Sequence, residues 1–144
     1  MGCVMTKIKL TNITDVDKAK EALIPAAEVR SFEVEGLVDT GAVLLVIPAD
    51  LARALGVSEV ERRTVRYADG HRAERSIVGG ILIEILGRRM VGEAVVEAEG
   101  TDVLIGQIPL EALDLIVDPA TRDLRKNPRS PGLAQNDLLR IQSA

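Results

Sequence analysis

The feature that most constrains this chain is the spacing of its apolar residues. They recur at every second position, or run unbroken over a few residues, in many short stretches separated by glycine, proline and aspartate. Alternation of this kind predicts half-buried β-strands, and short unbroken runs predict strands buried on both faces. Many short strands at close spacing predict an all-β fold, built as a closed or nearly closed barrel. The expected strands cover residues 4–11, 28–38, 42–47, 60–68, 72–78, 81–86, 90–96, 103–105, 116–117 and 123–124.

Two short helices are expected among these strands. The first spans residues 48–55, because proline suits a first helical turn and Gly56 stands where a helix ends. The second spans residues 108–115. Residues 12–25 are predicted to form a polar loop, with a helical turn around residues 19–23. The side chains that the second helix is expected to bury are Leu110, Leu113 and Ile108.

Three turns predict hairpins. Asp69-Gly70 lies between two extended segments, which is a strong hairpin signal. Residues 87–89 predict a second hairpin, and Asp118-Pro119 predicts a last one. Gly79-Gly80, which follows the first hairpin, is expected to be a hinge or a bulge.

The length of 144 residues suits one domain of ordinary size. Residues 1–125 are expected to form this domain. The composition then changes, and residues 126–144 begin with a basic, proline-containing segment. We expect this tail to be mobile or to lie at a dimer interface.

Composition excludes several functions. The chain has one Phe, one Tyr and no Trp, too few rings for stacking on single-stranded nucleic acid, and its net charge of −4 does not suit phosphate backbones. One Cys and one His cannot build a usual zinc site, and no apolar run has the length of a membrane span. We therefore expect a cytoplasmic protein with no metal, no cofactor, no nucleic acid and no membrane partner.

The segment Asp39-Thr40-Gly41-Ala42 is the candidate for chemistry. The aspartate follows the apolar strand residues Leu37 and Val38, where a carboxylate must be neutral, paired or hydrogen-bonded. The threonine supplies a hydroxyl, and the glycine permits a tight turn. An ordinary turn in which the aspartate bonds its own backbone is the plain alternative. The apolar flanks on both sides favour a functional loop.

A second apolar segment, Leu104-Ile105-Gly106, ends in glycine and precedes a helix. Together with the Asp-Thr-Gly-Ala segment and the hairpin between them, it makes the chain resemble the retroviral-type aspartic proteases, and most closely their small bacterial and archaeal relatives. The resemblance covers residues 4–125. It implies an acid-protease-type closed barrel with a flap hairpin, one lobe per chain. It also implies an aspartic endopeptidase.

The resemblance further implies a homodimer, because that family needs two such aspartates and this chain has one such triplet. Asp39 would meet its symmetry mate and share one proton with it, so that the pair activates a water molecule against a peptide bond. Thr40 would bond across the dimer. Gly41 would leave room for the backbone beside the aspartates, and Ala42 completes the loop. The substrate would be an extended peptide or protein.

The flap implied by the resemblance is the hairpin over residues 64–76. Its basic residues Arg62, Arg63, Arg66, Arg72 and Arg75 are expected on a solvated face, and so is His71 as a turn residue. The expected tip, which would cover the substrate, consists of Tyr67, Ala68, Asp69, Gly70 and His71. This tip is polar and has a single glycine, whereas retroviral flaps are rich in glycine.

Two alternatives remain open at this point. One is a non-catalytic peptide-binding or dimerisation module on the same fold, since a fold does not determine a function. The other is a plain structural β domain with a chance Asp-Thr-Gly triplet. It predicts a monomer in which Asp39 faces no symmetry mate.

Overall fold

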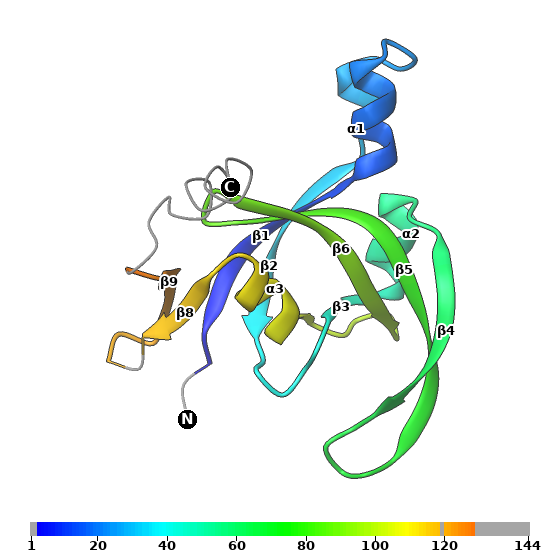
Figure 1. Cartoon of the computed structure of the whole chain (residues 1–144). Coiled ribbons are helices and arrows are strands. Elements are labelled where there is room, and N and C mark those ends of the chain that lie inside the picture. Colours follow the sequence, from blue (N-terminus) through cyan, green and yellow to red (C-terminus); the bar gives the residue numbers. More distant parts are fainter. Residues whose placement is uncertain (1–2, 119, 129–144) are drawn as a thin grey trace, which may run out of the picture.

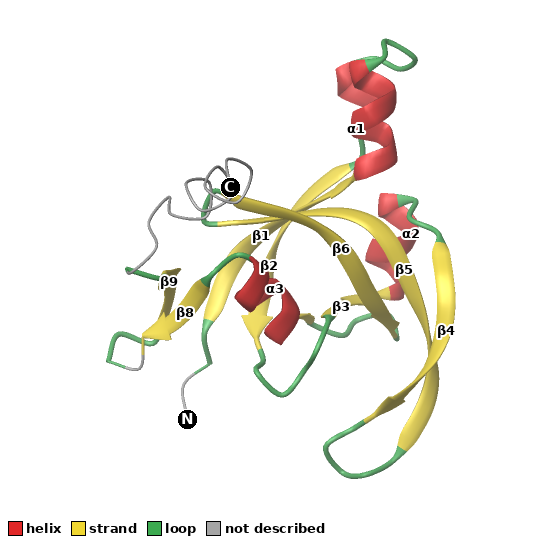
Figure 2. Cartoon of the chain, in the orientation of Figure 1, coloured by secondary structure: helices red, strands yellow, loops and turns green. Residues whose placement is uncertain are grey.

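Six strands close into a barrel in the computed structural model, which describes residues 3–118 and 120–128. The last strand of the ring pairs back with the first, since β5 (Arg72–Ile85) pairs with β1 (Met5–Asn12) from Lys9 opposite Glu84 to Asn12 opposite Ile81. The prediction of an all-β barrel with few short helices is therefore confirmed (Figures 1 and 2). Around the ring, the strands are β1 (Met5–Asn12), β2 (Ser31–Val38), β7 (Val103–Ile105), β3 (Leu45–Pro48), β6 (Arg88–Glu97) and β5 (Arg72–Ile85).

The core of the barrel is aliphatic. Alternate residues of each strand point inward, as Ile8 and Leu10 do in β1 and Ile83 and Ile85 do in β5. Branched aliphatic side chains suit a pleated, buried surface, and they fill this core without any buried aromatic ring among the described residues.

The strand β4 (Glu59–Arg66) lies outside the ring and pairs only with β5. The two strands form the predicted hairpin around Asp69-Gly70, which extends away from the barrel (Figure 1). The expected separate strands 72–78 and 81–86 are one strand, because β5 continues through a bulge between Val78 and Ile81. Gly79-Gly80 is thus a bulge.

The prediction of a polar loop over residues 12–25 is wrong. They contain the helix α1 (Ile13–Lys20), followed by the 3-10 helix η1 (Ala26–Glu28). The Asn12 side chain caps α1 by accepting a hydrogen bond from the Asp15 amide (3.1 Å). Lys18 and Lys20 lie in the last turn, where positive charges interact favourably with the helix dipole. The helix projects from the end of the barrel opposite the β4–β5 hairpin tip (Figure 1).

The two expected helices are present as α2 (Ala49–Leu55) and α3 (Gln107–Ala112). Pro48 caps α2 instead of opening it, and β3 begins at Leu45 because residues 42–44 belong to a loop. Leu110 and Leu113 are buried as predicted. Ile108 is 43% exposed, contrary to the prediction. Ile108 lies in the first turn of α3, and in this turn the neighbouring residue Pro109 is buried instead.

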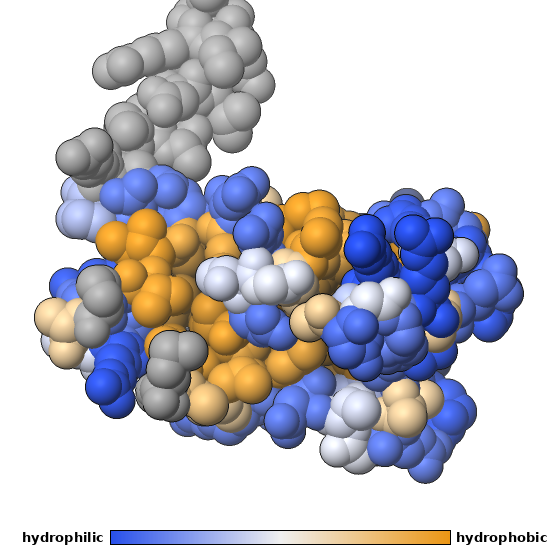
Figure 3. Space-filling model, turned by 90° about the horizontal axis from the view of Figure 1, so that it is seen from below, coloured by the Kyte–Doolittle hydropathy of each residue, from blue (hydrophilic) through white to orange (hydrophobic). Residues whose placement is uncertain are grey.

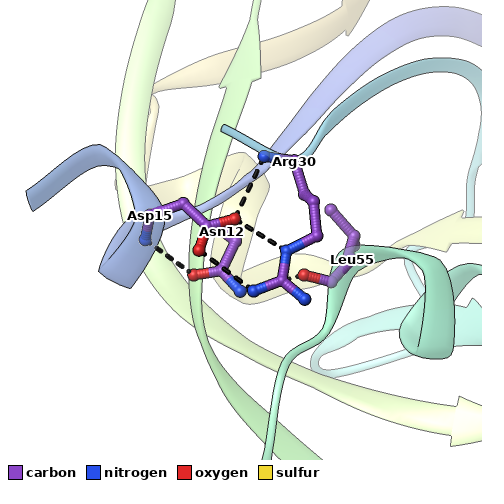
Figure 4. A network of polar contacts seen from close by, with 4 residues as sticks. All are labelled: Asn12, Asp15, Arg30 and Leu55. Atoms are coloured by element: carbon purple, nitrogen blue, oxygen red, sulfur yellow. Dashed lines mark hydrogen bonds and ion pairs between the residues drawn. The ribbon is translucent and has the colours of Figure 1, made fainter. Parts of the chain in front are cut away.

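A polar network joins α1, β1 and α2 (Figure 4). The Asp15 carboxylate accepts three hydrogen bonds from Arg30, namely from its Nε (2.7 Å), Nη2 (3.0 Å) and backbone amide (3.1 Å). The Asn12 amide group donates to the Leu55 carbonyl oxygen (2.9 Å). Hydrogen bonds from Arg30 lower the pKa of Asp15 to about 2, so this buried carboxylate stays ionised. Gly56 leaves space for the Arg30 guanidinium, which a Cβ atom would meet at 1.9 Å.

The predicted last hairpin is present as β8 (Leu115–Asp118) and β9 (Asp123–Lys126). Beyond this hairpin, the Asn127 amide donates to the Asp114 carbonyl oxygen (3.0 Å). Contacts with the domain therefore extend past residue 125, where the domain was expected to end. The rest of the predicted tail, residues 129–144, lies outside the described residues. None of the helices in the described ranges has the length and apolar character needed to cross a membrane.

Candidate active site

The loop that carries Asp39 lies where β2 leaves the barrel. There β2 runs parallel to β7, with Leu37 beside Leu104 and Val38 beside Ile105. The Asp39 amide donates to the Ile105 carbonyl oxygen (3.0 Å) and extends this pairing by one residue. The two segments singled out in the sequence are therefore neighbours.

Gly106 allows the Asp39 loop to pack directly on the start of α3. A Cβ atom on Gly106 would lie 2.4 Å from the Leu44 carbonyl oxygen and 2.7 Å from that of Ala42, closer than side chains come to backbone. From the next residue, the Gln107 amide donates to the Ala42 carbonyl oxygen and its side-chain amide donates to the Thr40 carbonyl oxygen (both 2.9 Å). Gln107 was not predicted as a site residue, because a lone glutamine gives no sequence signal.

The Asp39 carboxylate is half-buried and bound on one side. Its Oδ1 accepts a hydrogen bond from the Gly41 amide (2.9 Å), whereas Oδ2 has no partner in the described part of the chain. The Thr40 hydroxyl is exposed and has no partner among the same residues. The sequence analysis expected a carboxylate that is neutral, paired or hydrogen-bonded, and the bond from Gly41 makes one oxygen hydrogen-bonded.

Asp39 borders a cavity of about 950 Å³ between its loop, the barrel wall and the β4–β5 hairpin. Most of the lining is apolar, which suits a ligand with large apolar side chains. Leu104 of the second segment lines it, whereas Ile105 is buried in the core. The barrel wall and loop contribute Ala42, Val43, Leu44, Val46, Ile77, Val95 and Leu104 to the lining.

The loop also exposes apolar surface at this end of the molecule. Val43 is 61% exposed and Ile108 is 43% exposed, and the two residues are joined by a hydrogen bond from the Ile108 amide to the Val43 carbonyl oxygen (2.9 Å). Seen from below, a broad apolar surface lies among polar side chains (Figure 3). Exposed apolar surface beside a polar loop is typical of an interaction site.

The predicted tip residues divide into two groups. Tyr67 and Ala68 line the cavity, whereas Asp69, Gly70 and His71 are exposed in the turn and do not. His71 lies with its Nδ1 2.5 Å from the Asp69 carboxylate and stacks on the Tyr67 ring. The hydrogen bonds from His71 hold the pKa of Asp69 below its usual value. The interpretation of His71 as an exposed turn residue is confirmed.

The prediction that all five arginines lie on a solvated face is wrong for Arg75. Its side chain turns inward and its Nε donates to Glu97 at 2.9 Å. Glu97 also accepts a hydrogen bond from the Tyr67 hydroxyl. Sequence reasoning missed Glu97, because only the fold brings β6 beneath the hairpin.

No family model and no curated protein matches this chain. Within residues 3–118 and 120–128, no cluster of three or more His, Cys, Asp or Glu side chains could hold a metal ion. The polar groups around the Asp39 loop are its carboxylate, the Thr40 hydroxyl, and the backbone amide of Gly41 and the side-chain amide of Gln107.

Proposed function

We propose that this protein is an aspartic endopeptidase of the retroviral type, active as a homodimer. The observation that carries the proposal is the state of Asp39. One carboxylate oxygen is fixed by the Gly41 amide, and the other has no partner among residues 3–118 and 120–128, at the edge of a cavity of about 950 Å³. A fixed carboxylate with one free oxygen is suited to general acid-base work.

The second carboxylate would come from a second copy of the chain. Thr40 and the apolar residues Val43 and Ile108 are exposed beside Asp39, on the surface that a two-fold axis through this loop would bury. The Thr40 hydroxyl would then find its partner across the axis. A dimer of this kind makes each loop support the other.

The reaction would need only this pair. Two carboxyl groups in contact hold a single proton between them. The ionised one would take a proton from a bound water molecule, and the protonated one would donate to the carbonyl oxygen of the substrate. Water attacks the peptide carbon directly, and the leaving amine receives the proton. The β4–β5 hairpin would act as the flap that covers the peptide.

The test is the substitution Asp39→Asn, measured as cleavage of unfolded serum albumin between about pH 3 and pH 7. We expect cleavage to fall by at least about a thousandfold with an unchanged melting temperature. The matched control is Asp50→Asn, because Asp50 is exposed on α2 and does not line the cavity. A hydroxyl-containing transition-state inhibitor of the pepsin kind should block the wild-type protein. Equal cleavage by Asp39→Asn and wild type would refute the proposal.

The alternative is a peptide-binding or dimerisation module that uses the same cavity without cutting. The hydrogen bond from the Gly41 amide to the Asp39 carboxylate also forms in ordinary turns. This contact is therefore compatible with a module that has no catalytic role. A module of this kind would bind unfolded albumin equally well with Asp39→Asn and would leave it intact.

A further inference from the structure

We propose that Glu97 is a positioning residue that anchors the β4–β5 hairpin over the cavity through Tyr67 and Arg75, and that it thereby controls peptide binding. The role in peptide binding rests on the proposed peptidase function. The anchor itself can be tested without any activity.

The outer part of the hairpin has no strand neighbour in the barrel. The pairing of β5 with β6 stops at Ile77 and Val95, and from Ser76 to Arg72 the strand pairs only with β4. A two-stranded ribbon is only marginally stable by itself. Its position over the cavity must therefore be set by side chains.

One face of this ribbon is turned toward the barrel. The residues Val65, Tyr67, Ala73 and Arg75 are half-buried, whereas Arg66, Arg72 and Glu74, which lie between them, are exposed. Strand residues alternate between faces, so these half-buried side chains form the inner face of the hairpin.

Glu97, the last residue of β6, contacts this inner face of the hairpin. Its side chain is 16% exposed, and one carboxylate oxygen accepts from Arg75 Nε (2.9 Å) while the other accepts from the Tyr67 hydroxyl. The Arg75 guanidinium also lies 5.6 Å from the centroid of the Tyr67 ring. A single carboxylate of the barrel thus holds Arg75 of β5 and Tyr67, which directly follows β4.

Two of the three groups in this network, the Tyr67 hydroxyl and the Arg75 guanidinium, are held in their proton-donating forms. Burial, and then the bond to Glu97, raise the pKa of the Tyr67 hydroxyl, which therefore remains a donor. The Glu97 carboxylate is neutralised by Arg75, whose pKa is raised by the same contact. The anchor therefore adds no net charge to the apolar cavity wall.

The consequence concerns binding more than chemistry. Tyr67 and Glu97 both line the cavity that Asp39 borders, so the anchor sets the height of the space that a peptide must enter. Loosening it should weaken peptide binding and leave the acid-base step unchanged.

The experiment compares Tyr67→Phe, Glu97→Gln and the double variant with wild type. The control is Glu99→Gln, since Glu99 follows β6 closely but pairs with Arg53 on the exposed surface. Hydrogen exchange of the amides of residues 65–75 should become about tenfold faster in both single variants, with β1 and β2 unaffected. KM for a peptide substrate should rise about tenfold, with kcat within about threefold and an unchanged pH profile. The double variant should be no worse than Glu97→Gln alone, because both remove one network.

Unchanged hydrogen exchange in the hairpin of both single variants would overturn the anchor, whatever the activity. A fall in kcat at constant KM, or a shifted pH profile, would overturn its role in binding. If the wild-type protein cleaves no peptide at all, the proposed function fails, and hydrogen exchange still decides whether Glu97 holds the hairpin.

Discussion

Two aspartates each follow a strand of the barrel, and the fold treats them in opposite ways. Asp15, after β1, is 3% exposed, and Arg30 binds both of its carboxylate oxygens. Asp39, after β2, has one oxygen without a partner in the part of the chain that the structure describes, and it opens onto a cavity. Asp15 is buried and holds Arg30 through both oxygens, a position that suits a contribution to stability. The second oxygen of Asp39, unpartnered among the described residues, lies in a loop that also exposes Thr40 and Val43.

The largest effect should come from Gly106→Ala. This variant tests whether the loop that carries Asp39 depends on its close packing against Gly106 at the start of α3. The new Cβ atom would meet the backbone of Leu44 and Ala42, so we expect a loss of about 2–4 kcal/mol in the free energy of unfolding and of nearly all cleavage. Urea denaturation measures the first and a cleavage assay the second. Gly92→Ala is the control, since its nearest neighbour is the flexible end of Met90 at 3.1 Å. Equal stability of the two variants would contradict this account of the loop.

Asp15→Asn should lower stability and spare activity. Because the pKa of Asp15 is lowered to about 2 from an ordinary 3.8, its stabilisation is present above the ordinary value and is lost as the pH falls through about 2. We therefore expect a melting temperature more than about 5 °C below wild type at pH 7, and a gap that closes between about pH 4 and pH 2.

The control for that measurement is Asp17→Asn, because Asp17 is exposed on the same helix. Thermal unfolding followed by circular dichroism as a function of pH gives both curves. A gap that stays constant down to pH 2 would show that the charge of Asp15 does not stabilise the fold.

Thr40→Val should have a smaller effect, confined to assembly. The hydroxyl has no partner in the described part of the chain, so the melting temperature of the isolated chain should stay the same. If the hydroxyl bonds across a two-fold axis, the dimer dissociation constant should rise by about tenfold, and Thr40→Ser should restore it. Sedimentation equilibrium decides the point. A dimer equally tight in both variants would remove Thr40 from the interface.

Much of the Asp39 end could be predicted from the sequence, because its signals are local. An aspartate after two apolar strand residues, and a glycine after another apolar strand, each mark a constrained backbone position. The parallel pairing of β2 and β7 then brings the two segments together. The hairpin around Asp69-Gly70 was predictable for the same reason.

The rest depends on residues that are distant in the sequence. The helix α1 has a weak apolar pattern and is stabilised by the contact between Asp15 and Arg30, fifteen residues apart. Arg75 resembles its exposed neighbours in the sequence, and only Glu97, on another strand, explains why it turns inward. Ile108 is exposed because Pro109 occupies the buried position in the first turn of α3.

Mixing wild-type protein with the Asp39→Asn variant tests the paired aspartates most directly. After complete subunit exchange, verified by native mass spectrometry, the cleavage rate is measured against the fraction of wild-type chains. If each site needs Asp39 from both chains, activity should fall with the square of that fraction, to about one quarter in an equal mixture. A linear fall, to about one half, would show that each chain carries a complete site and would contradict the account.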